Sequence, residues 1–150
     1  MVSMPIPEPG QRGYDTIRNG NLTLRDVLEQ LGSYQPNKHR GAHLDPDLDP
    51  DACDRAPGWL PCFGQCDAAQ SHLRNQHVSA GDVILFFGAF RETITTADGL
   101  RWKRGSPKRH VLFGYLEIGR IVDVDVEHAD LPWAEGHPRR ATRRATRGCF

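Results

Sequence analysis

One acidic segment carries the residue types best suited to chemistry. His43 is followed by five aspartates, at positions 45, 47, 49, 51 and 54, with no Lys or Arg between residues 45 and 54. Alternate residues of an extended segment point to the same side, and imidazole and carboxylate groups are ligands that divalent cations bind. We therefore interpret His43, Asp45 and Asp47 as candidate catalytic residues that activate a water or a substrate hydroxyl. A divalent metal ion of unknown identity is the candidate cofactor.

The same segment has an interpretation without a metal ion. Aspartate and proline alternate in it, and an aspartate side chain stabilises a turn by accepting a hydrogen bond from the backbone that follows. In this interpretation Asp45 and Asp47 form turns, and His43 makes a single hydrogen bond within the loop. The later aspartates fit solvated surface in either case. The sequence leaves both interpretations open.

Three cysteines lie close to this segment, at positions 53, 62 and 66. Cys62 and Cys66 have a spacing that occurs in zinc sites, but a tetrahedral site needs two more ligands. These would be His43 and Cys53, which are loosely spaced. The sequence therefore favours buried or incidental thiols over a zinc site.

Aromatic and amide side chains follow the acidic segment and are suited to a nucleobase. Trp59 and Phe63 are candidates to stack on a base, and Gln65 and Asn75 are candidates to bind its hydrogen-bonding edge. His72 is a candidate general acid or base. The alternative is that the aromatic rings pack onto the core and that His72 is an ordinary hydrogen-bonded histidine.

A basic segment later in the chain is suited to phosphate. Arg91, Arg101, Lys103 and Arg104 are candidate phosphate-binding residues, and further Lys, Arg and His side chains follow at positions 108–110. Such a segment gives salt-sensitive affinity for nucleic acid that does not depend on base sequence. The alternative is a solvated hairpin whose cationic side chains discourage pairing between strand edges.

Two helices are predicted around these segments. Apolar residues at positions 24, 27, 28 and 31 share one face at helical spacing and Thr23 can cap the first turn, which predicts a helix over residues 23–31. A second, short helix is predicted over residues 68–75. Prolines interrupt residues 33–66, which are predicted to form a long loop, and a loop of this length is uncommon unless it is functional.

Strands are predicted after the loop. The continuous apolar run Val83–Phe87 is typical of a buried strand that is covered on both faces. Further strands are predicted at residues 91–96, 100–102, 110–116 and 118–126. The fold class that follows is α+β, with a mainly antiparallel sheet, one or two short helices and the long loop.

The net charge of zero conceals an uneven distribution. The chain of 150 residues has 19 basic and 19 acidic residues, but residues 139–150 hold five arginines and no acid. Residues 1–138, which we predict to form the domain, therefore carry 14 basic against 19 acidic residues, so contact with nucleic acid must be local. The tail, residues 139–150, has no apolar face and is predicted to be disordered.

Two further features bear on location. The apolar runs are too short to span a membrane, and the first residues lack the pattern of a signal peptide. They predict a cytoplasmic protein with reduced cysteines and no membrane partner. The sequence does not indicate the oligomeric state.

Short motifs in a fixed order between residues 5 and 138 carry a resemblance to a known family. They are Pro5-Ile6-Pro7-Glu8, Ala42-His43-Leu44-Asp45-Pro46-Asp47, Gly58-Trp59-Leu60-Pro61, Phe63-Gly64-Gln65, Ala68-Ala69-Gln70, His72-Leu73-Arg74-Asn75-Gln76, Gly81–Gly88 and Val111–Gly119. Together they resemble the nucleotide modification associated domain 3 family, which is grouped with systems that modify bases or handle modified bases.

The resemblance implies a nucleic-acid- or nucleotide-associated protein of a base-modification system, with DNA or a nucleotide as its partner, that recognises or processes a modified base. A metal-dependent hydrolase or transferase that uses the loop of His43, Asp45 and Asp47 is the alternative. Against the family's pattern, we expect a truncated member that is incomplete at both ends, so a fragment without function is a second alternative. The apolar strand after a Gly-Asp turn, and its return strand, are also similar to PUA-like modules, which implies a barrel-type sheet.

Overall fold

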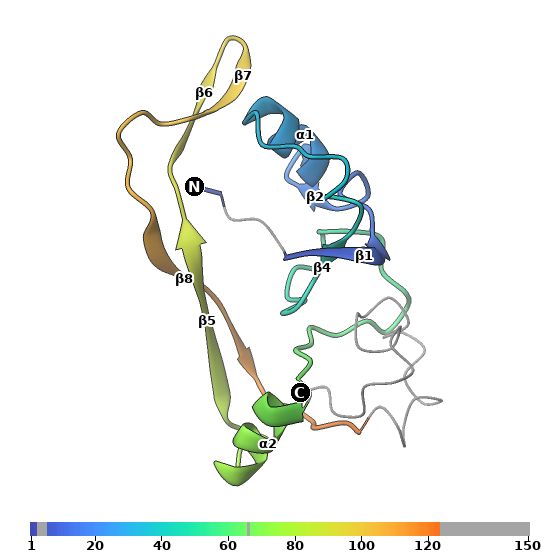
Figure 1. Ribbon diagram of the computed structural model, residues 1–150. Helices are drawn as coiled ribbons and strands as arrows, with labels where there is room; N and C mark the ends of the chain where they lie inside the picture. The colour runs from blue at the N-terminus through green and yellow to red at the C-terminus, as the bar shows by residue number, and fades with distance from the viewer. Residues whose placement is uncertain (3–5, 66, 124–150) are drawn as a thin grey trace. The chain divides into compact units, whose positions relative to one another are not determined.

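The computed structural model describes residues 1–2, 6–65 and 67–123, which form short helices and strands (Figure 1). The chain divides into two compact units. The first unit consists of residues 1–43, 51–53 and 87–113. The second unit consists of residues 44–50 and 54–86 and of the chain from residue 114 onward. Two predictions from the sequence, the tail at residues 139–150 and the end of the domain at residue 138, concern residues outside the described ranges.

The first unit begins with strand β1 (Ile6–Arg12), which pairs antiparallel with the short strand β4 (Ala42–His43). A hairpin follows β1, formed by β2 (Arg18–Asn19) and β3 (Leu22–Thr23). Gly20 occupies the turn of this hairpin with φ +62°, a conformation that glycine adopts without strain. Apolar alternation in the sequence predicts neither β1 nor the hairpin, because both are short and polar.

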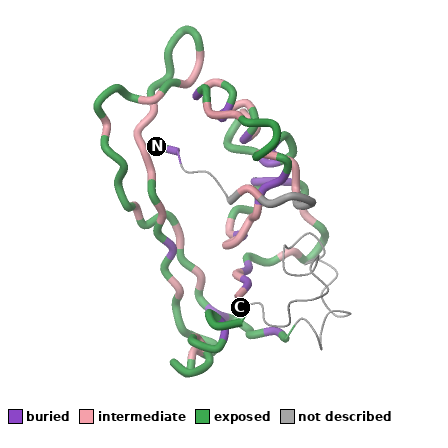
Figure 2. The backbone as a smooth tube through the Cα atoms, in the orientation of Figure 1, coloured by how far each residue is buried: buried purple, intermediate pink, exposed green. Residues whose placement is uncertain are grey.

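Helix α1 (Leu24–Gln30) confirms the predicted helix. The Thr23 side chain accepts a hydrogen bond from the backbone N–H of Asp26, and the Asp26 carboxylate accepts one from the backbone N–H of Thr23, which together form a capping box. Figure 2 shows that buried backbone is concentrated in α1 and the segments beside it. One core cluster of this unit is formed by Val2, Val27 and Leu31, against which Leu22, Leu100 and Trp102 pack.

Strands β6 (Thr93–Thr96) and β7 (Gly99–Trp102) form an antiparallel hairpin, in agreement with the sequence. Gln30, the last residue of α1, holds this hairpin. The side-chain oxygen of Gln30 accepts a hydrogen bond of 2.8 Å from the backbone N–H of Leu100, and its backbone carbonyl accepts one of 2.8 Å from Nη1 of Arg101. A Cβ atom at Gly99 would lie 2.8 Å from the same side-chain oxygen, so the contact requires glycine at that position.

The second unit contains helix α2 (Asp67–Asn75), one residue longer than predicted, and an isolated bridge between Asp47 and Cys62. Leu48 lies so close to Gly114 that a Cβ atom there would be 2.7 Å from the Leu48 Cδ1 atom. The backbone of Ile118 binds the turn that precedes residue 83, through hydrogen bonds with Gly81 and Asp82 of 2.7 and 2.9 Å.

Strands β5 (Val83–Phe90) and β8 (Arg109–Glu117) pair with each other, and β5 corrects one expectation. Val83, Leu85 and Phe87 are 55%, 58% and 71% exposed in the structure, so the strand is not covered on both faces. An entirely apolar run does not tell which face is covered, because periodicity carries no information when every residue is apolar.

The predicted barrel is also corrected. Within the described ranges the strands form four separate two-stranded sheets and no closed barrel, so the fold is mixed, with few helices and small sheets. The predicted strand over residues 118–126 is absent from its described part, residues 118–123, where only Val122 takes part in a bridge. The backbone hydrogen bonds of Ile118 with the turn before β5 divert the chain at this point. None of the helices in the described part of the chain is long and apolar enough to cross a membrane.

Candidate functional site

The acidic segment is anchored by an arginine that follows it. Both carboxylate oxygens of Asp47 accept hydrogen bonds from Arg55, with Nη1–Oδ2 and Nη2–Oδ1 distances of 2.6 Å. The two side chains are 10% and 12% exposed, so the ion pair is largely removed from water. Asp47 also exchanges two backbone hydrogen bonds of 2.9 Å with Cys62. A metal ion that bound these Asp47 oxygens would have to compete with Arg55 for them.

The other two candidate catalytic residues of this segment have different surroundings. The Asp45 carboxylate accepts a hydrogen bond of 2.9 Å from the backbone N–H of Gly64, which ties the segment to the loop before α2. His43 is half-buried at the end of β4 and pairs with Ile6 of β1. The hydrogen bond from Gly64 is a long-range contact and not the local turn that the metal-free interpretation assigns to Asp45, and the catalytic role of Asp45 stays a prediction.

The candidate base-binding rings are both in contact with protein groups. The Arg55 guanidinium lies over the Trp59 ring, 4.1 Å from its centroid, so one face of the indole is occupied. The Phe63 ring meets the buried Phe86 ring edge to face, at a centroid distance of 5.0 Å. Both rings are half-buried. A base can stack only on the face of Trp59 that Arg55 does not cover.

The remaining candidates of the second unit are dispersed. His72 and Asn75 are exposed on α2, and Gln65 is half-buried in the loop before it. The buried polar residue of α2 is Gln70, which sequence reasoning does not single out as a site residue. Within the second unit, hydrogen bonds tie Asp45 to Gly64 and Asp47 to Arg55, and a cation–π contact joins Arg55 to Trp59. Among the described side chains, none of these contacts involves His72 or Asn75.

The described residues also bear on metal binding. Within the ranges that the structure describes, no three His, Cys, Asp or Glu side chains lie where they could share a metal ion. Cys53 and Cys62 are both buried, and no disulfide joins them. Cys66 lies outside the described residues. The divalent metal ion therefore stays a prediction.

Most cationic side chains of the basic segment are exposed in the structure. Arg101, Lys103 and Arg104 are exposed, whereas Arg91 is half-buried with its guanidinium 5.3 Å from the centroid of the Trp102 ring. Lys103 forms an ion pair of 2.6 Å with Glu92, which lowers the pKa of that carboxyl through the hydrogen bond and the positive charge. The Arg104 side chain has no hydrogen bond or ion pair with any described residue. Residues 101–109 thus present cationic groups of which only some are neutralised.

The structure also contains a cavity that sequence reasoning missed. It lies in the first unit, has a volume of about 270 Å³ and is bordered by Tyr14, Arg25, Tyr34, His39 and Arg40, together with Gly13, Asp15 and Pro36. Its walls come from the segment after β1, from α1 and from the loop before β4. No motif joins these segments in the sequence. The sequence feature that could have indicated the cavity is the clustering of aromatic and cationic residues between positions 34 and 40.

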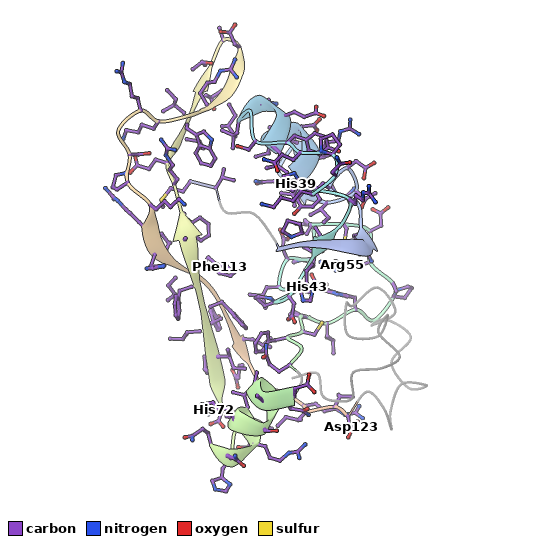
Figure 3. All side chains as sticks on the ribbon, in the orientation of Figure 1. His39, His43, Arg55, His72, Phe113 and Asp123 are labelled. Carbon is purple, nitrogen blue, oxygen red and sulfur yellow. The ribbon has the colours of Figure 1, made fainter. Side chains whose placement is uncertain are left out.

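His39, which is labelled in Figure 3, contacts two other aromatic residues that border the cavity. Its ring stacks on Tyr34 at a centroid distance of 5.8 Å and meets Tyr14 edge to face at 5.1 Å. The Nδ1 atom accepts a hydrogen bond of 2.9 Å from the backbone N–H of Gln35. Burial and the charge of Lys38 lower the pKa of His39, so the ring is neutral at pH 7 and carries its hydrogen on Nε2.

Comparisons with known proteins give one match. A family model described as nucleotide modification associated domain 3 matches residues 1–149. No curated protein and no solved structure matches the chain. The match covers nearly the whole sequence, so the chain belongs to the nucleotide modification associated domain 3 family.

Proposed function

We propose that this protein associates with nucleic acid in a base-modification system and contacts the phosphate backbone through the hairpin β6–β7 and the loop after it. Family membership supports the association with nucleotide modification. The observation that carries the proposal is the charge of residues 99–110, which include five Lys and Arg residues and no acid. Because residues 1–138 are acidic overall, binding has to use such a local patch.

The geometry of this patch supports phosphate contact. Arg104 and Lys108 are exposed, and their side chains make no hydrogen bond or ion pair with the residues that the structure describes. Arg101 is held by the Gln30 carbonyl, and Lys103 by Glu92. The patch therefore combines fixed cations, whose positions the fold determines, with mobile ones that can follow a phosphate chain.

The test is the salt dependence of DNA binding. The double variant Arg104→Gln/Lys108→Gln removes two charges without breaking a described side-chain contact. We expect it to weaken binding of a DNA duplex and to lower the slope of log K against log salt by up to about 1.8, since each phosphate contact contributes about 0.9. Fluorescence anisotropy at several salt concentrations measures this slope.

The matched control is Arg74→Gln, which removes one exposed charge from α2. We expect this control to leave both the affinity and the slope unchanged. Equal slopes for the wild-type protein and the double variant would contradict the proposal.

Recognition of a modified base is the finer part of the proposal. Trp59, Phe63, Gln65 and Asn75 are the proposed base-binding residues, with the open face of Trp59 as the stacking surface. Trp59→Ala should weaken binding of single-stranded DNA by about 1–3 kcal/mol, the contribution of one stacked base. Phe63→Leu should have a smaller effect, because Phe63 already contacts the buried Phe86.

Catalysis by His43, Asp45, Asp47 and His72 is the second candidate function. What favours it is the anchoring of Asp45 and Asp47 in one loop by Gly64 and Arg55. On this candidate, His43→Ala abolishes turnover of a modified base or nucleotide and leaves DNA affinity within about twofold. Retained turnover in that variant would exclude His43 from the reaction.

A further inference from the structure

We propose that the cavity of the first unit is a binding site for the phosphate and sugar of a single nucleotide. None of its residues is among the proposed base- or phosphate-binding residues, so it is a second site within the same protein. The proposal rests on the proposed function for the kind of ligand, a nucleotide, and on the cavity itself for the place.

Three side chains that border the cavity have hydrogen-bond donors without a partner among the described residues. Arg25 uses its Nε atom to bind Glu29 at 2.8 Å, and its two Nη atoms have no partner among the described residues. The guanidinium of Arg40 likewise has no hydrogen bond or ion pair with the described part of the chain. The Nε2 atom of His39 is a third donor in this position, because Nδ1 accepts the bond from Gln35. Two guanidinium groups and an imidazole N–H around one cavity match the acceptor oxygens of a phosphate.

The other residues that border the cavity restrict the kind of ligand that it can bind. Asp15 also borders the cavity, and its carboxylate can only accept hydrogen bonds. A bare phosphate would leave this carboxylate facing a like charge, whereas a ligand with hydroxyl or amino groups beside its phosphate would satisfy it. Tyr14 is buried, and the Tyr34 ring is contacted by both His39 and the Arg25 guanidinium, so the two rings support the wall and leave the ligand a mainly polar lining. The phosphate and the sugar hydroxyls of a nucleotide match this lining of cationic donors and one carboxylate.

The dimensions agree with one small ligand. A volume of about 270 Å³ is just below the range of roughly 300–1,000 Å³ that small-molecule sites occupy, which suits a single nucleotide, either free or at the end of a strand. The ring contacts of His39 with both tyrosines hold the walls in place before the ligand arrives, so little ordering is required on binding.

The site is tested by calorimetric titration of the full chain at pH 8, where His39 is neutral. The probes are inorganic phosphate, a deoxynucleoside, the matching 5′-monophosphate and a short single-stranded DNA with a 5′-phosphate. We expect the monophosphate to bind at least tenfold more tightly than phosphate or the nucleoside. Arg40→Gln should weaken its binding by about tenfold, the value of one charge-assisted hydrogen bond.

Arg74→Gln is the control, because Arg74 is an exposed cation on α2 that does not border the cavity. Its affinity for the monophosphate should stay within about twofold of the wild-type value. Tighter binding of the phosphorylated DNA than of the monophosphate assigns the site to a strand end, and the reverse order assigns it to a free nucleotide. Equal affinity of the wild-type protein and a folded Arg40→Gln variant for the monophosphate overturns the proposal.

The same experiments separate this inference from the proposed function. DNA binding that depends on Arg104 and Lys108, without any binding of the monophosphate, overturns the cavity site and leaves the proposed function in place. Binding of the monophosphate that depends on Arg40, without salt-dependent DNA binding, supports the cavity site and contradicts the proposed role of the hairpin.

Discussion

Arg55 holds the carboxylate of Asp47 in a two-pronged ion pair, with both N–O distances at 2.6 Å, and covers the ring of Trp59 with the same guanidinium. One side chain therefore satisfies a candidate catalytic acid and occupies one face of a candidate stacking residue. Because the ion pair is largely buried, a substitution that removes one partner should lower the stability of the fold.

Arg55→Ala should lower the free energy of unfolding by about 3 kcal/mol, since it leaves the Asp47 carboxylate buried without a partner. Asp47→Asn should have a smaller effect, because the amide oxygen still accepts one hydrogen bond. Denaturation with urea measures both. As a control, Arg74→Ala on α2 should change stability by less than about 0.5 kcal/mol. A similar small change in Arg55→Ala would show that the ion pair does not stabilise the fold.

The capping box of α1 should be measurable in the same way. Thr23→Ala removes the side-chain oxygen that binds the N–H of Asp26 and should cost about 0.5–2 kcal/mol. Thr23→Ser keeps the hydroxyl and should remain close to wild type in thermal denaturation. Equal losses in the two variants would attribute the effect to the missing methyl group and not to the cap.

Asp26 links this cap to pH. Hydrogen bonds from Thr23 lower the pKa of Asp26 below its ordinary value of 3.8. A carboxyl whose pKa is lower in the folded state stabilises the fold above its unfolded pKa, and this contribution is lost as the pH falls through the folded pKa. Wild-type protein should therefore lose stability below about pH 4, relative to Asp26→Asn, in melting curves recorded at several pH values.

His39 should titrate below its ordinary pKa of 6.5, because burial and Lys38 disfavour its charged form. Lys38→Gln should raise the pKa of His39 toward 6.5, which the ring signals in NMR spectra report directly. The neutral His39 ring stabilises the fold above pH 6.5, the ordinary pKa of histidine in the unfolded chain. This contribution is lost as the pH falls through the lower pKa of His39 in the folded state. An unchanged titration in Lys38→Gln would leave burial as the sole cause.

Phe86 and Phe87 are neighbours on β5 with opposite exposure, 8% and 71%. Phe86→Ala should cost about 3–5 kcal/mol because it empties space next to Phe63. Phe87→Ala should cost less than about 1 kcal/mol, because its ring is mostly in water and its described ring contact is with His110. Similar costs in urea denaturation would mean that the outer face of β5 is covered in solution.

The sequence was most informative where local chemistry decides the structure. Thr23, the apolar positions of α1 and the Gly99 turn act over a few residues, so the helix and the hairpin β6–β7 were predicted correctly. The strand β1 and the absence of a closed barrel depend on pairing between distant segments, which single-sequence periodicity does not report. For the same reason, the sequence did not show that one face of the strand Val83–Phe87 is exposed.

The same distinction between local and long-range determinants applies to the candidate sites. Exposure of Arg101, Lys103 and Arg104 follows from charge alone and agrees with the structure. The partner of Asp47 is Arg55, only eight residues away, yet the sequence does not distinguish this pairing from a pairing with a metal ion. The cavity beside His39 draws on three segments, and no local pattern joins them.

The contact between Gln30 and Gly99 has a consequence for relatives of this protein. The two residues are 69 positions apart, yet the Gln30 oxygen occupies the space in which a side chain at position 99 would begin. Gly99 also has φ +103°, a backbone conformation that residues with a side chain rarely adopt, so a shorter residue at position 30 would free the space and still leave a larger residue at position 99 strained. Family members should therefore retain glycine at the turn of this hairpin whatever residue stands at the end of the helix.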